Sequence, residues 1–295
     1  MPITKTAVVT IAGRPNVGKS TLCNALVGEK IAIVSPKPQA TRNRVIGVAN
    51  RGETQLVLVD TPGFHRPRNK LGDYMQKVVR ESIEETDCVL MIVEPVTDRT
   101  PSEEALICRI EESGVPCVLA INKIDTVPKE ALLAVIASYA GRFSFDAIIP
   151  ISAKRNDGLD VLLKQLETYA VDGPQLFPDD VFTDQPEQRL ACEILREKMM
   201  LCLDQEIPHG LAVEIESFKQ GENGVTDIGF IIYCEKQSHK SIIIGKDGSM
   251  LKTISSKARP EIERMLGTKV FMKTWVKVKE NWRDSGSLVR RFGYE

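Results

Sequence analysis

Residues 13–21 of this chain (GRPNVGKST) combine glycines, a lysine and two hydroxyl groups at the spacing GxxxxGK[ST], which suits phosphate binding. In that pattern the glycines let backbone N–H groups converge on phosphate oxygens, the lysine reaches the outer phosphates and the first hydroxyl binds Mg²⁺. The apolar residues 7–12 predict a buried strand before the loop, and residues 21–27 predict a helix after it. We therefore predict a nucleoside triphosphate site formed by Gly13, Asn16, Val17, Gly18, Lys19, Ser20 and Thr21.

A second polar cluster, DTPG at residues 60–63, follows a predicted strand over residues 54–60. A turn signal joins that strand to residues 44–50, so the two runs predict a hairpin. At the end of a buried strand, Asp60 would hold the Mg²⁺ shell. The backbone N–H of Gly63 would contact the γ-phosphate and sense its loss.

Residues 33–43 (IVSPKPQATRN) contain two prolines and no regular apolar spacing, which predicts a loop. Thr41 would fold over Mg²⁺ and the γ-phosphate when triphosphate is bound, and the alternative is a threonine with no role beyond the loop. The predicted metal ligands are Ser20, Thr41 and Asp60. The residues predicted to act on the phosphates during hydrolysis are Lys19, Thr41, Gly63 and Asn16.

The sequence NKID follows the apolar residues 115–121 and indicates which base is bound. At the end of a parallel strand, Asp125 could accept hydrogen bonds from N1–H and the 2-amino group of guanine, which adenine lacks. A site left with unpaired polar groups rejects the wrong base strongly. The N–H of Ala153, after the predicted strand 147–151, would donate to the guanine carbonyl. We therefore predict that GTP and GDP bind through Asn122, Lys123, Asp125, Ser152, Ala153 and Lys154.

Strands and helices alternate through the first half of the chain, with one early hairpin. Further helices are predicted over 70–83, 101–110 and 159–169, and a further strand over 88–93. This order predicts an α/β P-loop GTPase domain, with a doubly wound, mostly parallel sheet and one antiparallel strand. We place this domain at residues 1–173, a linker rich in Pro and Asp at 174–187, and a second domain at 188–295.

The second domain is predicted to have the element order αββααβ, with the GxxG turn of residues 245–248 between its two central helices. That order resembles an α+β type II KH domain, in which the turn admits the backbone of about four single-stranded nucleotides. The alternative is an ordinary connection between two helices. The predicted RNA contacts are Lys240, Ile243, Ile244, Gly245, Lys246, Asp247, Gly248, Lys252 and Lys257.

Charge is distributed unevenly along the chain, whose net charge is −1. Residues 236–283 contain 12 Lys or Arg residues and 4 Asp or Glu residues, a net charge of +8, which favours a polyanionic partner. Within the turn, Asp247 opposes this charge. Trp275 could stack on a base, but it lies in a strand with alternating apolar residues, so we expect it in the core.

Composition is that of an ordinary globular protein, 42% hydrophobic and 27% charged. The seven cysteines are scattered without a CxxC pair and are expected to be mostly buried thiols in a reducing compartment. The first residues lead straight into a predicted strand, and no apolar run approaches the ~18 residues of a membrane span. We expect a cytoplasmic protein, at most peripheral at a membrane.

Taken together, GRPNVGKST, DTPGF, NKID, SAK and the C-terminal KH-like region resemble the Era family of bacterial ribosome-assembly GTPases. EILREKMM, VEIESFK and HKSIIIGKDGSMLKTIS are the stretches more specific to that family. The resemblance covers essentially the whole chain. It implies binding to the single-stranded 3′ end of small-subunit ribosomal RNA, assistance in 30S maturation and peripheral association with the inner membrane.

Hydrolysis is expected to be slow, because Phe64 stands where many GTPases carry a glutamine that orients water. Asn16, as in similar GTPases, could help to hold K⁺ beside the phosphates, or it could only shape the loop. RNA is the other candidate activator. Two alternatives remain: a membrane-linked or cell-cycle signalling GTPase with a KH-like protein or membrane contact, and an inactive GTP-sensing scaffold.

Overall fold

The computed structural model describes residues 2–221 and 224–294, which divide into two compact units. The first unit contains most of the chain up to Asp184. The second contains the chain from Gln185 onward together with two short segments from the N-terminal half, Ile33–Ala40 and Arg68–Leu71. The loop that precedes Thr41 therefore belongs to the second unit.

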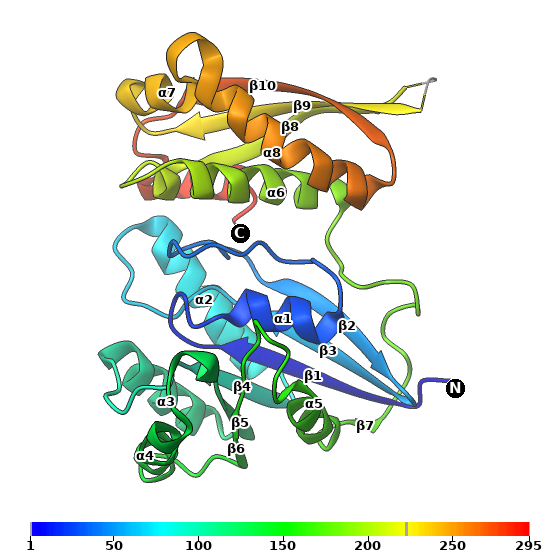
Figure 1. Cartoon of the computed structure of the whole chain (residues 1–295), viewed down its shortest axis with the longest axis vertical. Helices are drawn as coiled ribbons and strands as arrows, with labels where there is room; N and C mark the ends of the chain where they lie inside the picture. The colour runs from blue at the N-terminus through cyan, green and yellow to red at the C-terminus, as the bar shows by residue number, and fades with distance from the viewer. Residues whose placement is uncertain (1, 222–223, 295) are drawn as a thin grey trace. The chain divides into compact units, whose positions relative to one another are not determined.

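The first unit is built on a seven-stranded sheet with the strand order β2-β3-β1-β4-β5-β6 and with β7 beside β1 (Figure 1). Its strands are β1 (Lys5–Ala12), β2 (Val45–Arg51), β3 (Thr54–Asp60), β4 (Cys88–Val93), β5 (Cys117–Ile121), β6 (Ala147–Pro150) and β7 (Val171–Asp172). Strand β2 is antiparallel to β3, the two-residue β7 is antiparallel to β1, and the other pairs are parallel. The predicted mostly parallel sheet is confirmed.

Helices cover both faces of this sheet. They are α1 (Lys19–Val27), α2 (Lys70–Glu84), α3 (Pro101–Ser113), α4 (Lys129–Ala140) and α5 (Leu159–Glu167). Helices α1 and α5 contribute to one buried cluster, and α2, α3 and α4 contribute to another. The sequence patterns do not predict α4, because its apolar residues point in several directions: Leu133 is 73% exposed, whereas Tyr139 is buried.

The parallel strands deliver the predicted site to one edge of the sheet. The loops that follow β1, β3, β5 and β6 contain the phosphate-binding motif, DTPG, NKID and SAK, respectively. In doubly wound sheets, ligands bind at the carboxyl ends of the strands. The topology therefore brings together four motifs that are far apart in the sequence.

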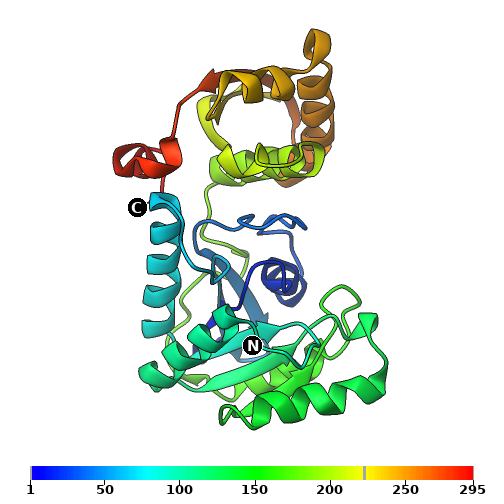
Figure 2. The ribbon, with the colours of Figure 1, turned by 90° about the vertical axis from the view of Figure 1, so that its left-hand side faces the viewer.

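The second unit has the predicted order αββααβ, with one more helix at its end. Its elements are α6 (Glu187–Cys202), β8 (Ala212–Gln220), β9 (Val225–Cys234), α7 (Gln237–Ile244), α8 (Ser249–Leu266), β10 (Lys269–Val278) and α9 (Gly286–Arg291). The three strands form a sheet of order β10-β9-β8, with β10 parallel to β9. Apolar residues from α6, α7 and α8 share one core with the sheet. Figure 2 shows the ribbon of this unit, from α6 in yellow-green to α9 in red.

The two tryptophans of the second unit differ in their exposure. Trp282 is fully buried, and its indole N–H donates to the carbonyl of Gly210 at 2.9 Å. Trp275 is 42% exposed, so the prediction that it lies in the core is wrong. Along β10, Val270 and Val276 face the helices, and Trp275 has the opposite parity. Five of the seven cysteines are buried as free thiols, as expected.

Candidate functional site

The loop between β1 and α1 is held close to its neighbours. Gly18 has a φ of 103°, and a Cβ built on it would lie 2.3 Å from the side-chain nitrogen of Asn122. A Cβ on Gly13 would lie 2.5 Å from the carbonyl oxygen of Ile92. Both positions therefore require glycine, the first because of its backbone conformation as well.

Lys19 is buried within this loop. Its Nζ donates to the carbonyl oxygens of Gly13 and Arg14 at 3.1 and 3.0 Å. Burial lowers the pKa of Lys19 to about 8. A phosphate group beside Nζ would favour the charged amine, so this lysine is poised to bind an anion.

The three predicted metal ligands lie together. The Ser20 hydroxyl donates to Oδ2 of Asp60 at 2.6 Å, and Thr41 Oγ1 lies 2.8 Å from Ser20 Oγ and 3.4 Å from Asp60 Oδ2. The second carboxylate oxygen of Asp60 is buried without a hydrogen-bond partner in the described part of the chain. Burial raises the pKa of Asp60 to about 6. A nearby cation would reverse that shift and satisfy the orphaned oxygen.

Mg²⁺ fits this donor set. Mg²⁺ prefers oxygen ligands and is commonly held by one or two protein groups plus substrate phosphates and water. Among the described residues, no group of three or more His, Cys, Asp or Glu side chains could hold a metal by itself. The oxygens of Ser20, Thr41 and Asp60 are therefore suited to a metal ion that arrives with phosphates.

The DTPG turn lies against the phosphate-binding loop. A Cβ on Gly63 would come within 2.8 Å of Pro15 Cα, and the N–H of Phe64 donates to the carbonyl of Gly13 at 3.0 Å. His65 contacts the carbonyl of Gly63 through Nδ1 at 2.7 Å. The Gly63 peptide is thus placed beside the loop that the phosphates would occupy.

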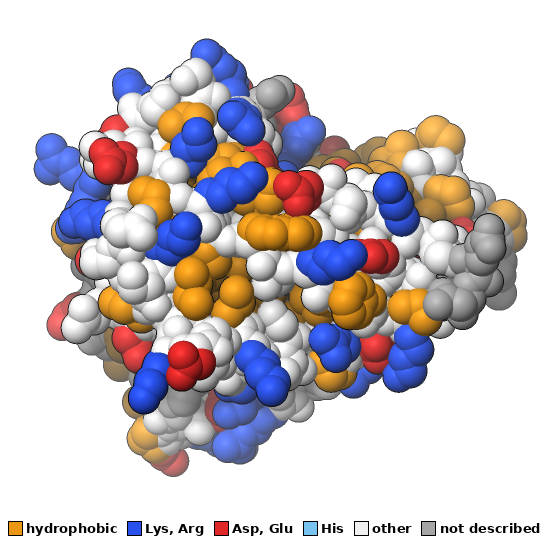
Figure 3. All heavy atoms as spheres, turned by 90° about the horizontal axis from the view of Figure 1, so that it is seen from above, with side chains coloured by type: hydrophobic (Ala, Val, Ile, Leu, Met, Phe, Trp, Pro, Cys, Tyr) orange, Lys and Arg blue, Asp and Glu red, His pale blue; other side chains and the backbone are white. Residues whose placement is uncertain are grey.

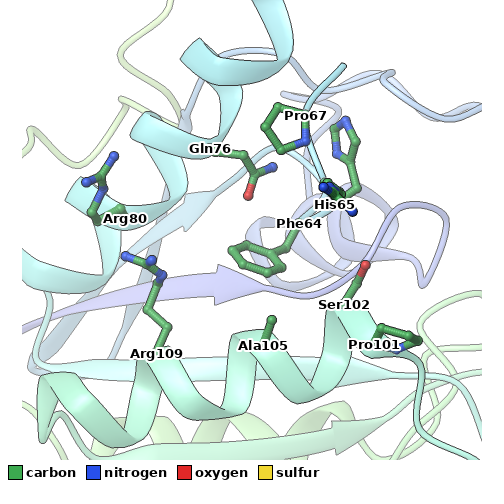
Figure 4. A pocket seen from close by; sticks show the side chains of 10 residues that line it. Phe64, His65, Pro67, Gln76, Arg80, Pro101, Ser102, Ala105 and Arg109 are labelled. Carbon is green, nitrogen blue, oxygen red and sulfur yellow. The ribbon is translucent and has the colours of Figure 1, made fainter. Parts of the chain in front are cut away.

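Phe64 turns toward α3 and packs against the core that lies beneath α2, α3 and α4. It lines a cavity of about 430 Å³, in which Ala105 lies below the ring and Arg80 and Arg109 lie at one side (Figure 4). A phenyl ring cannot donate to or accept from an attacking water. The geometry therefore gives Phe64 a packing role in the segment that follows β3.

Asp125 is prepared to accept hydrogen bonds. Its Oδ1 accepts from the Ser152 hydroxyl at 2.6 Å, and this hydrogen bond lowers the pKa of Asp125. Asn122 connects the motifs: its Nδ2 donates to the carbonyl of Val17 at 2.8 Å, and its Oδ1 accepts from the N–H of Ala153 at 3.0 Å. The Ala153 N–H, which we expected to donate to guanine, is thus bonded to Asn122 here.

Sequence reasoning missed an ionic link on the same edge. Lys123 donates to the carbonyl of Asn16 at 2.7 Å and also pairs with Glu94, which pairs in turn with Arg14. Arg14 further pairs with the buried Glu103 at 3.1 Å. Glu94 directly follows β4. Its position at the carboxyl end of a parallel strand could have indicated that it lies near the site.

The GxxG turn of the second unit has the backbone that its glycines allow. Gly245 has a φ of 74°, and a Cβ on it would lie 2.7 Å from the backbone nitrogen of Met250. Asp247 and Gly248 also have positive φ, 51° and 76°. A Cβ on Gly248 would meet no described atom within 4 Å. The turn is therefore tight at Gly245 and open at Gly248, as close approach of a ligand backbone would need.

The predicted RNA contacts differ in their exposure. Lys246, Asp247, Lys252 and Lys257 are exposed, and Lys240, Ile244, Gly245 and Gly248 are half-buried. Ile243 is fully buried in the core, and its role as an RNA contact stays a prediction. The neighbouring Ile242 is 50% exposed. Figure 3 shows the face of the molecule seen from above the view of Figure 1, where Lys and Arg side chains lie around a group of hydrophobic side chains.

Two families match separate parts of the chain. Residues 8–123 match the family described as 50S ribosome-binding GTPase, and residues 206–283 match the family described as KH domain. Two solved structures cover nearly the whole chain. One is Era in complex with MgGDPNP and nucleotides 1506–1542 of 16S ribosomal RNA, with a TM-score of 0.96, 39% identity and 99% coverage of both chains. The other is an Aquifex aeolicus Era variant bound to GDP·AlF4⁻, with a TM-score of 0.95, 39% identity and coverage of 98% of this chain and 99% of that one.

Two curated relatives are also similar to this chain over nearly its whole length. The GTPase Era of Ruminiclostridium cellulolyticum is 51% identical over 99% of this chain and 98% of its own. The GTPase Era of Alkaliphilus metalliredigens is 48% identical over 99% of both chains. With its nucleotide-binding edge and its KH domain, this chain belongs to the Era family of GTPases.

Proposed function

We propose that this GTPase is a switch that binds the single-stranded 3′ end of small-subunit ribosomal RNA and assists assembly of the 30S subunit. The observation that carries the proposal is the full-length likeness to an Era protein bound to MgGDPNP and 16S RNA. The open GxxG turn supports it from the chain's own geometry. One matching family is described as binding the 50S subunit, but its match covers residues 8–123 alone. The relative bound to 16S ribosomal RNA matches nearly the whole chain, so we base the choice of ribosomal subunit on that relative.

We assign the phosphate chemistry to residues at the carboxyl edge of the first sheet. Lys19 binds the outer phosphates, and the N–H of Gly63 contacts the γ-phosphate. Ser20, Thr41 and Asp60 would hold Mg²⁺, which would supply positive charge beside the phosphate oxygens. Asp125 selects guanine, and Asn122 keeps the base-binding and phosphate-binding loops in register.

Hydrolysis without an activator is proposed to be slow, because Phe64 packs against α3 and leaves the attacking water unoriented by that side chain. We propose K⁺ beside Asn16 as one activator. The expected result is faster hydrolysis in K⁺ than in Na⁺ for the unchanged chain, and equal rates in both salts for Asn16→Ala. Phosphate release at matched ionic strength measures this. Equal rates for the unchanged chain would leave RNA as the remaining candidate.

RNA binding through the turn is tested with Gly248→Asp. The substitution is expected to lower affinity for RNA of nucleotides 1506–1542 by at least about 10-fold, because a carboxylate would face the phosphates, and to leave GTP affinity unchanged. The matched control is Gly267→Asp, since Gly267 also has a positive φ and is open. Fluorescence anisotropy of labelled RNA measures both. Equal losses in the two variants would remove the turn from the proposal.

We place the GTPase domain at residues 1–173, a linker at 174–187 and the KH domain at 188–295. A cytoplasmic protein with peripheral association at the inner membrane is part of the same proposal, and no helix in the described residues is long and apolar enough to span a membrane. The alternative is a membrane-linked or cell-cycle signalling GTPase. Sequence-specific binding of single-stranded RNA at physiological salt favours the first function, and sequence-blind, salt-sensitive binding favours the second.

A further inference from the structure

One face of β10 presents a regular series of side chains away from the helices. Every second residue of the strand is exposed, and Phe271 and Trp275 are 52% and 42% exposed. The intervening residues Val270 and Val276 belong to the core. We call this surface the β10 face and define it by Lys269, Phe271, Lys273, Trp275 and Lys277.

The rings and amines of the β10 face are arranged over the neighbouring strand. A Cβ on Gly229 of β9 would lie 3.2 Å from Cζ3 of Trp275, so the absence of a side chain at Gly229 makes room for the indole. Lys273 Nζ lies 5.2 Å from the centroid of the Phe271 ring and 3.0 Å from Oδ2 of Asp227. The aromatic rings are thus supported by the sheet while a large part of each stays open.

The spacing of these groups suits single-stranded nucleic acid. A strand advances about 3.3 Å per residue, so alternate side chains follow at intervals of about 7 Å. Surfaces that bind single strands combine aromatic rings, on which bases stack, with positive charges that track the backbone. On the β10 face a lysine lies on each side of each ring.

The length of RNA bound by the relative leaves room for a second surface. A GxxG turn clamps about four nucleotides, and the RNA in the related structure runs from nucleotide 1506 to nucleotide 1542. Most of that RNA is therefore outside the span of the turn. The β10 face lies on the side of the sheet opposite to the helices that carry the turn.

We propose that the β10 face is a second RNA-binding surface, on which Phe271 and Trp275 stack unpaired bases and the three lysines hold the adjacent phosphates. The inference rests on the proposed RNA-binding function and adds a site to it. A lipid surface is disfavoured, because interfacial binding needs a continuous apolar face. Here a lysine separates the two rings.

The test is the affinity of the full chain for RNA of nucleotides 1506–1542, measured by fluorescence anisotropy. The double variant Phe271→Ala/Trp275→Ala is expected to bind about 100-fold more weakly, because each stacked base contributes about 10-fold or more. Replacing the three lysines by glutamine should reduce the slope of log affinity against log salt by between about 0.7 and about 2, because Lys269 and Lys273 also pair with Glu263 and Asp227. The matched control is Phe182→Ala, since Phe182 is 45% exposed in the first unit.

A second readout does not depend on a variant. The chain has two tryptophans, and Trp282 is fully buried, so quenching of tryptophan fluorescence by RNA would report on Trp275. Unchanged affinity in the double variant, or fluorescence unaffected by saturating RNA, would overturn the proposal. Binding to anionic phospholipid vesicles that is lost in the double variant, with RNA affinity unchanged, would assign the face to membranes. If the unchanged chain does not bind this RNA, the proposed function itself fails.

Discussion

Replacement of Asp125 by asparagine is expected to lower the affinity for GTP by about 10⁴-fold, because an amide cannot accept hydrogen bonds from both donors on guanine. The carboxylate is held for this role by the Ser152 hydroxyl at 2.6 Å. The same substitution is expected to create affinity for xanthosine triphosphate, whose 2-carbonyl can accept a hydrogen bond from the new amide. Competition against a fluorescent guanine nucleotide measures both affinities.

The gain in affinity for xanthosine triphosphate distinguishes altered base recognition from misfolding, since a misfolded variant would bind neither nucleotide. Ser152→Ala serves as the milder control, because it removes the hydrogen bond that orients Asp125 and keeps the carboxylate. It should weaken GTP binding by about 10-fold, the value of one hydrogen bond to a charged group. Undiminished GTP affinity in Asp125→Asn would mean that base recognition lies elsewhere on the edge.

Arg196→Gln should have the second largest effect, although Arg196 belongs to the C-terminal unit. Arg196 is 1% exposed, donates to the backbone carbonyl of Ala40 and pairs with Glu193. The adjacent Glu197 accepts from the N–H of Val34 at 2.8 Å. These contacts hold the segment Ile33–Ala40, and the next residue is Thr41.

Loss of the guanidinium is therefore expected to act in two ways. Breaking one partner of a buried ion pair costs about 3–5 kcal/mol of stability. Displacing Thr41 from Ser20 and Asp60 should slow hydrolysis by about 10²-fold, the usual effect of a misplacement of about 1 Å. Urea unfolding gives the first quantity, and single-turnover phosphate release at saturating GTP gives the second.

Arg283→Gln separates stability from positioning. Arg283 pairs with the buried Glu235 at 2.6 Å in the same unit and does not contact the segment before Thr41 in the described structure. The variant Arg283→Gln should therefore be less stable to unfolding but should hydrolyse GTP at the unchanged rate. Equal rates in the two variants would show that Arg196 matters only for folding. If Arg196→Gln hydrolyses GTP at the same rate as Thr41→Ala, the loss of activity in both variants is due to the loss of Thr41 from the site.

Motifs with a fixed chemical purpose could be predicted from the sequence. The phosphate loop, DTPG and NKID each require particular atoms at a strand end, and the structure brings Ser20, Thr41 and Asp60 together. The order of elements also predicted both domains, because apolar periodicity records which faces are buried.

Residues whose role depends on distant partners could not be predicted in this way. Glu94 and Arg196 are ordinary charges in the sequence, and their partners become visible only in the fold. Trp275 was placed on the wrong face because its aromatic character was weighed above its parity with the lysines of β10. Residue type could not tell which of two neighbouring isoleucines is exposed: Ile242 is 50% exposed, and Ile243 is buried.

The assignment of Ile33–Ala40 to the C-terminal unit also has a consequence for biosynthesis. The bond between Val34 and Glu197 joins residues 163 positions apart, so the partner of this early segment is made late in translation. Domains generally fold as units during synthesis, starting from the N-terminus. A nascent chain can thus complete the central sheet long before α6 emerges, and the segment before Thr41 acquires its native contacts only when most of the protein has been made.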